Sequence, residues 1–448
     1  MAHGQETPQV PARPAILFNR WQEDWSVLAN PDTPREPLDS LKYISLSHDD
    51  PKVYLSFGAG LRERFESNGT QAFGTGPNRS DSYLISRAEL SADLRLGAAV
   101  QVFVQLQNDD AVDKMRLAPV DRDRLDVEQA FVVVTEPLGD GRLQIRLGRQ
   151  QIAFDVQRFV SVKDGPNVRQ SYDAAWVEYE EGPWTVSGFY SQPVQVRDKA
   201  AFDDYSSGRL TYGGTRVERK VSGLGKVSLY LSRFTQDNVA FPNATGDERR
   251  NILDVQVTGA AHGYDWDFGA MGQNGRIGAQ DIQAWAFGLL GGYTLRDALW
   301  TPRLGLQADG ASGDRNPHDR RLETFNPLFP NGSYFTLANY TGYVNLIHVK
   351  SSLTLHPRKA LKLMVAGAAQ WRETTGDAIY TQPAIPVANT AGKPGRYTGS
   401  YGQLRVDWAA TPHVSLALEA VHFVVGGALQ RAGGHDANYL GLEAKFGW

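Results

Sequence analysis

Strict alternation of apolar and polar side chains is the feature that most constrains how this chain can fold. In the closing stretch HDANYLGLEAKFGW, one parity carries Leu440, Leu442, Ala444, Phe446 and Trp448. The other parity carries Tyr439, Gly441, Glu443, Lys445 and Gly447. Successive side chains of a β-strand point to opposite faces, so this stretch predicts a strand with one apolar and one charged face.

The same period-two pattern recurs from residue 53 to the end, and helical periodicity is nearly absent. About 18 segments show it, near 53–65, 83–96, 98–107, 124–135, 142–152, 171–181, 183–192, 207–217, 226–235, 250–260, 263–273, 281–294, 302–310, 342–355, 360–372, 399–409, 413–425 and 435–448. We therefore expect an all-β chain.

The connections between these segments alternate in length down nearly the whole chain. The long ones lie near 67–81, 108–123, 153–170, 193–206, 236–248, 311–341 and 373–398. The short ones lie at Gly97 and near 136–141, 181–183, 261–263, 356–360 and 410–413. In an up-and-down meander this alternation puts all long loops at one end, as in transmembrane barrels with long extracellular loops and short periplasmic turns.

Together the two patterns predict a single antiparallel transmembrane barrel of about 18 strands in the bacterial outer membrane. Lipid would solvate the apolar parity, and pairing of the last strand with the first would leave no open edge in hydrocarbon. Trp448 would lie at the periplasmic interface, where indole rings are favoured. The C-terminal aromatic strand also resembles the signal read by the barrel-assembly machinery, which is thus an expected partner, together with outer-membrane lipid.

Composition excludes several other classes of protein. The longest apolar stretch, AWAFGLLGGY (284–293), is too short for a membrane-spanning helix. The absence of cysteine excludes disulfides, thiolate metal sites and a cysteine nucleophile. A formal net charge of −4 argues against a nucleic-acid binder.

The N-terminal region differs from the rest of the chain. Residues 1–15, MAHGQETPQVPARPA, lack the apolar core of a signal peptide, so we expect a leader to have been removed and the Pro-rich start to be extended. We divide the chain into a periplasmic lead-in segment, 1–50, and a barrel, 51–448.

Basic side chains fall on the parity opposite the apolar one and therefore face the lumen. These are Arg62, Arg64, Arg87, Arg95, Arg146, Lys362, Arg372 and Arg405. Glu89 and Asp93 share that parity, so the lumen is mixed rather than uniformly positive. Arg149, Arg158 and Arg169 adjoin a long loop that could fold inward to form a constriction. The alternative role for each arginine is to brace the wall in a ladder of salt bridges.

Several stretches carry a resemblance to a known family. They are NRWQEDWSVLANPDTPREPLDSLKYISL (19–46), LRERFES (61–67), LGRQQIAFDVQRFVSVKDGPNVRQSYDAAWV (147–177), FNPLFPNGSYF (325–335) and LHPRKALKLMVAGAAQWRETTGDAIY (355–380). In this order they resemble the alginate-export family of outer-membrane channels over roughly residues 18–448. The resemblance implies a monomeric 18-stranded barrel whose arginine-rich lumen passes a polyuronate outward. It adds Asp173, within the third stretch, to the candidate lumen residues.

We therefore expect a passive channel for an anionic, carboxylate-bearing glycan or small acid, most readily the export of an alginate-like polyuronate. Guanidinium groups would replace water around successive carboxylates through charge-assisted bonds, and several moderate sites suit conduction better than one tight site. The alternative is a nutrient porin for uptake of small organic acids or sugars. A barrel enzyme is a third class, but no nucleophile-elbow motif is present, so we assign no catalytic residue and no cofactor.

Two acidic runs remain, NDDAVDK (108–114) and RDKAAFDDY (197–205). Clustered carboxylates can bind a hard cation. Such runs are more often solvated loops, and the sequence alone assigns no metal site to them.

Overall fold

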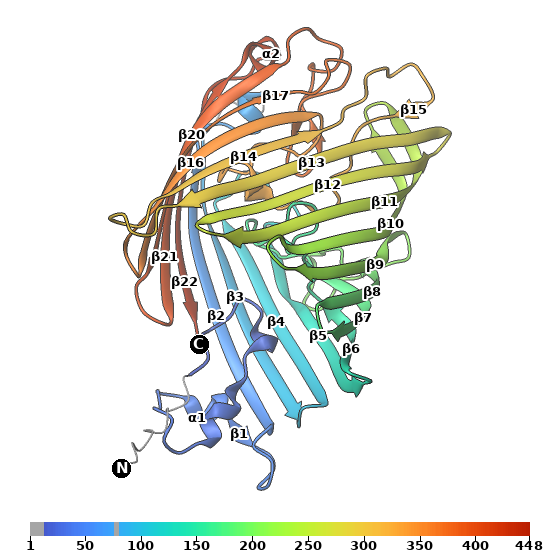
Figure 1. Cartoon of the computed structure of the whole chain (residues 1–448). Helices are drawn as coiled ribbons and strands as arrows, with labels where there is room; N and C mark the ends of the chain where they lie inside the picture. The colour runs from blue at the N-terminus through green and yellow to red at the C-terminus, as the bar shows by residue number, and fades with distance from the viewer. Residues whose placement is uncertain (1–12, 76–79) are drawn as a thin grey trace.

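The chain forms one closed β-barrel, seen in a computed structural model that describes residues 13–75 and 80–448 (Figure 1). The first twelve residues of the expected lead-in lie outside this range. The main sheet joins twenty strands; two of them, β1 (Ile44–Ser45) and β15 (Arg321–Leu322), are two-residue additions to the other eighteen. No helix among the described residues is long and apolar enough to cross a membrane.

The barrel strands follow the chain in order. They are β2 (Val53–Asn68), β3 (Asp81–Leu96), β4 (Val100–Val112), β5 (Asp123–Leu138), β6 (Gly141–Gln150), β7 (Tyr172–Glu181), β8 (Trp184–Pro193), β9 (Leu210–Val221), β10 (Gly225–Phe241), β11 (Ala244–Ala261), β12 (Tyr264–Ile277), β13 (Gln280–Thr294), β14 (Arg303–Ala311), β16 (Leu346–Arg358), β17 (Leu361–Trp371), β20 (Tyr397–Ala409), β21 (Val414–Val425) and β22 (Ala437–Gly447).

The remaining elements are short. They are the helices α1 (Asp39–Lys42) and α2 (Gly427–Arg431), the 3-10 turns η1 (Arg20–Gln22), η2 (Trp25–Ala29), η3 (Ala72–Gly74) and η4 (Gly332–Tyr334), and a separate hairpin of β18 (Tyr380–Thr381) and β19 (Ile385–Pro386).

The first and last barrel strands close the cylinder. β2 pairs antiparallel with β22 from Gly60 opposite Gly447 to Asn68 opposite Tyr439. Every barrel strand therefore has two neighbours, which satisfies the backbone groups that an open edge would leave unpaired. The predicted eighteen-stranded antiparallel barrel is confirmed.

The two parities of β22 separate as the alternation predicts. Leu440, Leu442 and Phe446 are 39%, 44% and 45% exposed, whereas Glu443 is 8% exposed. The apolar side chains thus cover the outside of the barrel, and the charged ones point inward. This arrangement suits an acyl-chain solvent outside and a polar lumen inside.

Connection length separates the two ends of the barrel, which we call the turn end and the loop end. The turn end carries the C-terminus and short turns such as 97–99 and 139–140, and the loop end carries long segments such as 151–171, 312–345 and 372–396. The prediction of a long loop at 236–248 is wrong. β10 and β11 continue through it and leave only residues 242–243 between them, because Val239, Phe241 and Ala244 join an apolar cluster with Ile277 and Ile282.

Two loop-end segments, 151–171 and 312–345, fold back into the barrel. Ser161 N donates to Phe329 O at 2.9 Å, and Phe329 N donates to Phe159 O at 2.9 Å. Aromatic side chains of both segments pack with inward-facing residues of β7 to β10, such as Trp176 and Tyr212. A hydrophobic core therefore fills the part of the lumen beside these strands.

The N-terminal segment packs against the turn end, where Figure 1 shows α1 and β1 below the barrel strands. β1 pairs with β2, and Arg20 donates to the Trp448 carbonyl oxygen at 2.9 Å. Trp21 reaches into the barrel mouth, with its ring 5.7 Å from that of Phe131. The segment thus lies partly across the turn-end opening.

Candidate functional site in the lumen

A partly buried carboxylate, Asp164, marks the tip of the inward loop 151–171. Arg87 of β3 donates to Asp164 Oδ1 at 2.6 Å, and Arg169 of the same loop does so at 2.9 Å. Lys445 of β22 donates to Asp164 Oδ2 at 3.3 Å. Burial alone would raise the pKa of Asp164, but Arg169, Arg87 and Lys445 overcome it and hold the pKa well below its usual range. Cations from β3 and β22, the two strands that flank β2, and from the loop thus converge on one carboxylate.

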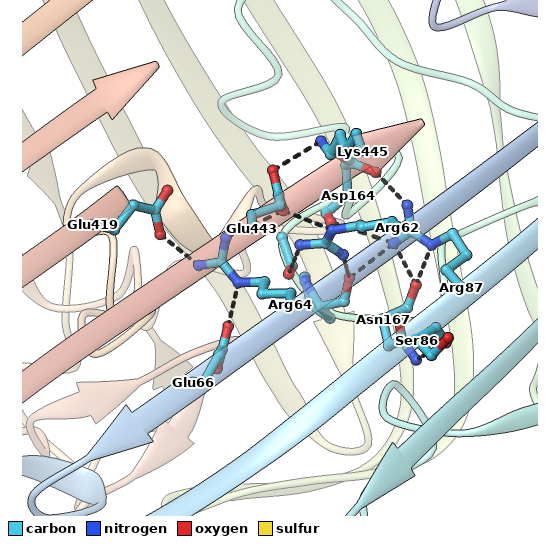
Figure 2. Close-up of polar contacts among 12 residues, drawn as sticks. Arg62, Arg64, Glu66, Ser86, Arg87, Asp164, Asn167, Glu419, Glu443 and Lys445 are labelled. Carbon is cyan, nitrogen blue, oxygen red and sulfur yellow. Dashed lines mark hydrogen bonds and ion pairs between the residues drawn. The ribbon is translucent and has the colours of Figure 1, made fainter. Parts of the chain in front are cut away.

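The backbone of the loop tip, Asp164–Asn167, is held by two arginines of the wall (Figure 2). Arg62 donates to Pro166 O at 3.0 Å and to Gly165 O at 3.2 Å. Arg87 donates to Asn167 O at 2.8 Å and to Pro166 O at 2.9 Å. Loop carbonyls that would otherwise be buried without donors are satisfied in this way, so the tip has a defined position in the lumen.

Carboxylates of β2, β21 and β22 balance the wall arginines of β2 and β20. Glu443 accepts from Arg62 at 2.7 Å and from Arg64 at 3.2 Å. Arg64 also pairs with Glu66 and with Glu419, which in turn accepts from Arg405. Figure 2 shows the first part of this ladder, from Glu419 to Lys445. The wall arginines therefore brace neighbouring strands as well as lining the lumen.

The loop tip lies between two cavities. On the loop-end side, a cavity of about 260 Å³ is lined by Lys163, Gly165, Pro166 and Asn167 of the tip, together with Tyr83. On the turn-end side, a cavity of about 350 Å³ is lined by Phe18, Glu89, Arg169 and Lys445, among others. The Asp164 cluster is thus a candidate constriction between the two openings.

Two lysines of this constriction were not among the residues selected from the sequence. Lys163 faces the loop-end cavity and donates to Gln170 at 3.2 Å. Burial lowers its pKa to about 8, and in the described part of the chain it pairs with no carboxylate. Lys445 could have been found from its place on the charged parity of β22, whereas Lys163 gave no signal beyond its position in a long loop.

Other sequence-selected residues hold the constriction in place. Arg158 is 2% exposed and joins the loop to the wall through Asp267 at 2.8 Å and Gln256 at 3.1 Å. Glu89 accepts from Arg169 and from Gln105. The inward loop thereby contacts opposite sides of the barrel, which fixes the width of the passage.

Four further candidates lie nearer the turn end. Arg95 pairs with Asp93 at 2.9 Å and donates to the Trp21 carbonyl oxygen at 2.7 Å. The Arg146 guanidinium lies 4.8 Å from the Trp21 ring centroid. Lys362 pairs with Asp407 at 3.4 Å. Arg95 and Arg146 therefore help to seat the N-terminal segment, away from the Asp164 cluster.

Three predicted lumen positions need correction. Arg149 and Asp173 pair at 2.9 Å, but they share the outward parity of Leu147, which is 53% exposed. Arg372 follows β17 and donates to Thr390 O at 2.6 Å and Gly395 O at 2.8 Å. It anchors the loop 372–396, because its buried guanidinium satisfies loop carbonyls that have no strand partner.

The profile of the family described as alginate export matches residues 53–443. The chain belongs to the alginate export family. No curated protein sequence matches it. Among solved structures, the barrel is similar to OccK2 (OpdF) of Pseudomonas aeruginosa, solved in complex with glucuronate, with 12% identity, a TM-score of 0.56, and coverage of 88% of this chain and 96% of that one.

Two further solved structures share the fold. OccAB1 of Acinetobacter baumannii has 12% identity and a TM-score of 0.57, covering 92% of this chain and 99% of that one. A BenF-like porin of Pseudomonas fluorescens Pf-5 has 11% identity and a TM-score of 0.58, covering 88% of this chain and 99% of that one. Family and fold together make this protein an outer-membrane channel.

Proposed function

We propose that the solute of this channel is a carboxylate-bearing anion, with export of an alginate-like polyuronate as the leading case. The observation that carries the proposal is the placement of a carboxylate, Asp164, among Arg87, Arg169 and Lys445 at the candidate constriction. A site that already holds one carboxylate has the charge and the donors to receive another. Charge-assisted bonds of this kind are stronger than neutral ones.

Passage would proceed by exchange between several moderate sites. Lys163 stands on the loop-end side of the tip, and Arg169 and Lys445 border the turn-end cavity. Glu89 and Glu443 sit beside these cations and temper their attraction for an anion. A solute carboxylate can therefore bind and leave, which conduction requires. No step of this passage involves covalent chemistry, so we infer a passive channel rather than an enzyme.

One structural neighbour is consistent with a uronate solute. OccK2 was solved in complex with glucuronate, a sugar that carries one carboxylate. At 12% identity the likeness extends to the fold alone. It suggests glucuronate as a small probe for the constriction.

The second candidate is uptake of small organic acids. It is favoured by the inward packing of segments 151–171 and 312–345, which occupies lumen space that a polymer would need. Outer-membrane barrels keep their termini and short turns in the periplasm, so the loop end would face outward in either case. Passage of uronate oligomers of increasing length separates the two candidates, since only an export channel needs to pass long chains.

Planar-bilayer recording of the purified full chain tests the proposal. We expect glucuronate and its oligomers to block the ionic current, and glucose at equal concentration to leave it unchanged. Lys445→Ala should weaken the block several-fold, because it removes one cation next to Asp164. Arg276→Ala is the matched control, since Arg276 is exposed and pairs with the exposed Asp281 at the loop end. Equal effects of glucuronate and glucose would contradict the proposal.

A further inference from the structure

Acidic residues from separate stretches of the sequence meet at the loop end of the barrel. Asp123 and Asp126 lie at the start of β5, and Asp204 lies in the loop 194–209 between β8 and β9. One carboxylate oxygen from each lies within 4.8 Å of the other two. Asp109 of β4 faces Asp123 across the strand pair and adds a fourth acid nearby.

The side chain of Asp123 has no hydrogen-bond or ion-pair partner in the described part of the chain. Its side chain is 5% exposed, and its Oδ1 is buried without a hydrogen bond. Among residues 13–75 and 80–448 no lysine or arginine forms an ion pair with it. An uncompensated buried carboxylate is strongly unfavourable, so the group needs either a proton or a bound cation.

The other two carboxylates are held in place around Asp123. Asp126 Oδ2 accepts from the Asp204 backbone N–H at 3.0 Å, and Asp204 Oδ1 accepts from the Arg197 N–H at 2.6 Å. Phe202 N donates to Leu125 O at 3.0 Å and keeps the loop against β5. Backbone contacts thus orient the carboxylates of Asp126 and Asp204 beside Asp123. The Arg149 guanidinium lies 3.5 Å from Asp126, and Arg122 and Arg124 pair with Asp198 of the same loop.

We propose that Asp123, Asp126 and Asp204 bind a calcium ion that fastens the loop 194–209 to strand β5. Calcium takes carboxylate oxygens at about 2.3 to 2.6 Å in flexible geometry. Oxygens that all lie within 4.8 Å of one another can share such an ion. Magnesium is less suited, because it requires near-ideal octahedral geometry at about 2.0 to 2.1 Å.

The cation would change how firmly the loop is held. Without it, the negative charges of Asp126 and Asp204 repel across the contact that joins strand and loop. With it, the three carboxylates become ligands of one ion, and loop opening must break those bonds. Arg197 and Lys199 are exposed in this loop, so trypsin can report its opening.

Terbium and calcium titrations of the full chain, refolded into detergent free of lipopolysaccharide, test the site. Terbium replaces calcium in oxygen sites and is sensitised by a nearby tyrosine, here Tyr205 beside Asp204. We expect saturable luminescence that calcium displaces with a dissociation constant on the order of 10⁻⁴ to 10⁻³ M, the range of extracellular calcium modules. Calcium should also slow tryptic cleavage after Arg197 and Lys199.

Asp123→Asn and Asp204→Asn should each weaken calcium binding at least tenfold and abolish the protection from trypsin. Asp281→Asn, an exposed acid of the loop end, is the control and should bind as the parent does. Heat-modifiable mobility in gels will show whether Asp123→Asn has refolded. A loss of calcium binding can then be distinguished from a loss of fold. No saturable binding up to about 10 mM calcium, or unchanged binding in Asp123→Asn, would overturn the proposal and leave Asp123 protonated instead.

Discussion

The Nζ atom of Lys42 lies 4.4 Å from the centroid of the Trp448 ring and 4.9 Å from that of Trp25. Lys42 belongs to the N-terminal segment, and Trp448 is the last residue of the sequence. The ammonium group is buried and has no hydrogen-bond acceptor among the described residues. Two indole faces thus replace water around one cation and join the segment to the end of the barrel.

Docking of this segment should become more favourable as the pH rises from about 8 to 10.5. Burial lowers the pKa of Lys42 from 10.5 to about 8. In that window the released segment binds more protons than the docked one, so raising the pH favours docking; below pH 8 the penalty is constant. The docking free energy becomes more favourable by at most roughly 3 kcal/mol. The change is smaller if the indoles stabilise the charged ammonium.

A fluorophore can follow this docking, because the chain contains no cysteine. A dye can be attached to Asp32→Cys, at an exposed position of the segment. Its signal should show release of the segment by urea, with a midpoint concentration that increases between pH 8 and 10.5. In Lys42→Met the midpoint should no longer depend on pH in this window. The same slope in both proteins would show that another group titrates.

Asp164→Asn should make the channel more selective for anions. The substitution leaves Arg87, Arg169 and Lys445 without the carboxylate on which they converge. A solute carboxylate then no longer competes with Asp164, and we expect glucuronate to block the current at three- to tenfold lower concentration, about 1 kcal/mol. Reversal potentials in a salt gradient measure the selectivity. A decrease in anion preference would mean that Asp164 orders the cations rather than competing with the solute.

Arg87→Ala should release the loop tip. Arg87 is fully buried and donates to Pro166 O, Asn167 O and the Asp164 carboxylate. Its removal leaves the buried Asp109 carboxylate without its arginine partner and Asn167 O without this donor. The loss should cost about 3 to 5 kcal/mol. Single-channel currents should become noisier as the tip moves, and the thermal midpoint should fall.

Arg87→Lys should not restore the quiet current, because one ammonium cannot span carbonyls that a planar guanidinium reaches together. Arg276→Ala, which removes an exposed arginine, is the control. A quiet trace for Arg87→Ala would show that Arg62 alone positions the tip.

Much of the barrel could be predicted from alternation, because parity is a local property of the sequence. The pattern of Leu440, Leu442 and Phe446 against Glu443 is enough to separate the outside from the inside of β22. The same rule, applied to Leu147 and Arg149, would have placed Arg149 outside. Asp173 was predicted from family resemblance alone, and its pairing opposite Arg149 places it on the same outward parity.

The constriction could not be predicted in the same way. Asp164 meets Lys445 across 281 positions of sequence, and Arg62 meets Glu443 across 381. Those contacts depend on the register that closes the barrel and on the path of the loop 151–171 through the lumen. Neither is encoded in local periodicity, so the sequence marked this loop as a candidate without its partners.

Trp21→Ala should widen the turn-end opening without detaching the segment. The Trp21 carbonyl oxygen accepts from Arg95 at 2.7 Å and from Gln101 at 2.8 Å, and these bonds survive truncation of the ring. The ring itself contacts Phe131 and Arg146 and lines a cavity of about 510 Å³ at the turn end. We expect a higher single-channel conductance and a loss of about 1 to 3 kcal/mol in docking. Unchanged conductance would place the narrowest point elsewhere, at the Asp164 cluster.

Leu442→Arg should impair insertion, because Leu442 faces outward in the middle of β22. An arginine on the lipid face costs about 2 to 4 kcal/mol near the bilayer midplane and less toward the interfaces. Heat-modifiable mobility of protein refolded into lipid vesicles measures the folded fraction, which should fall relative to the parent. Leu442→Val keeps the position apolar and should fold normally. If Leu442→Arg inserted as well as Leu442→Val, the outward face of β22 at this position would not contact acyl chains.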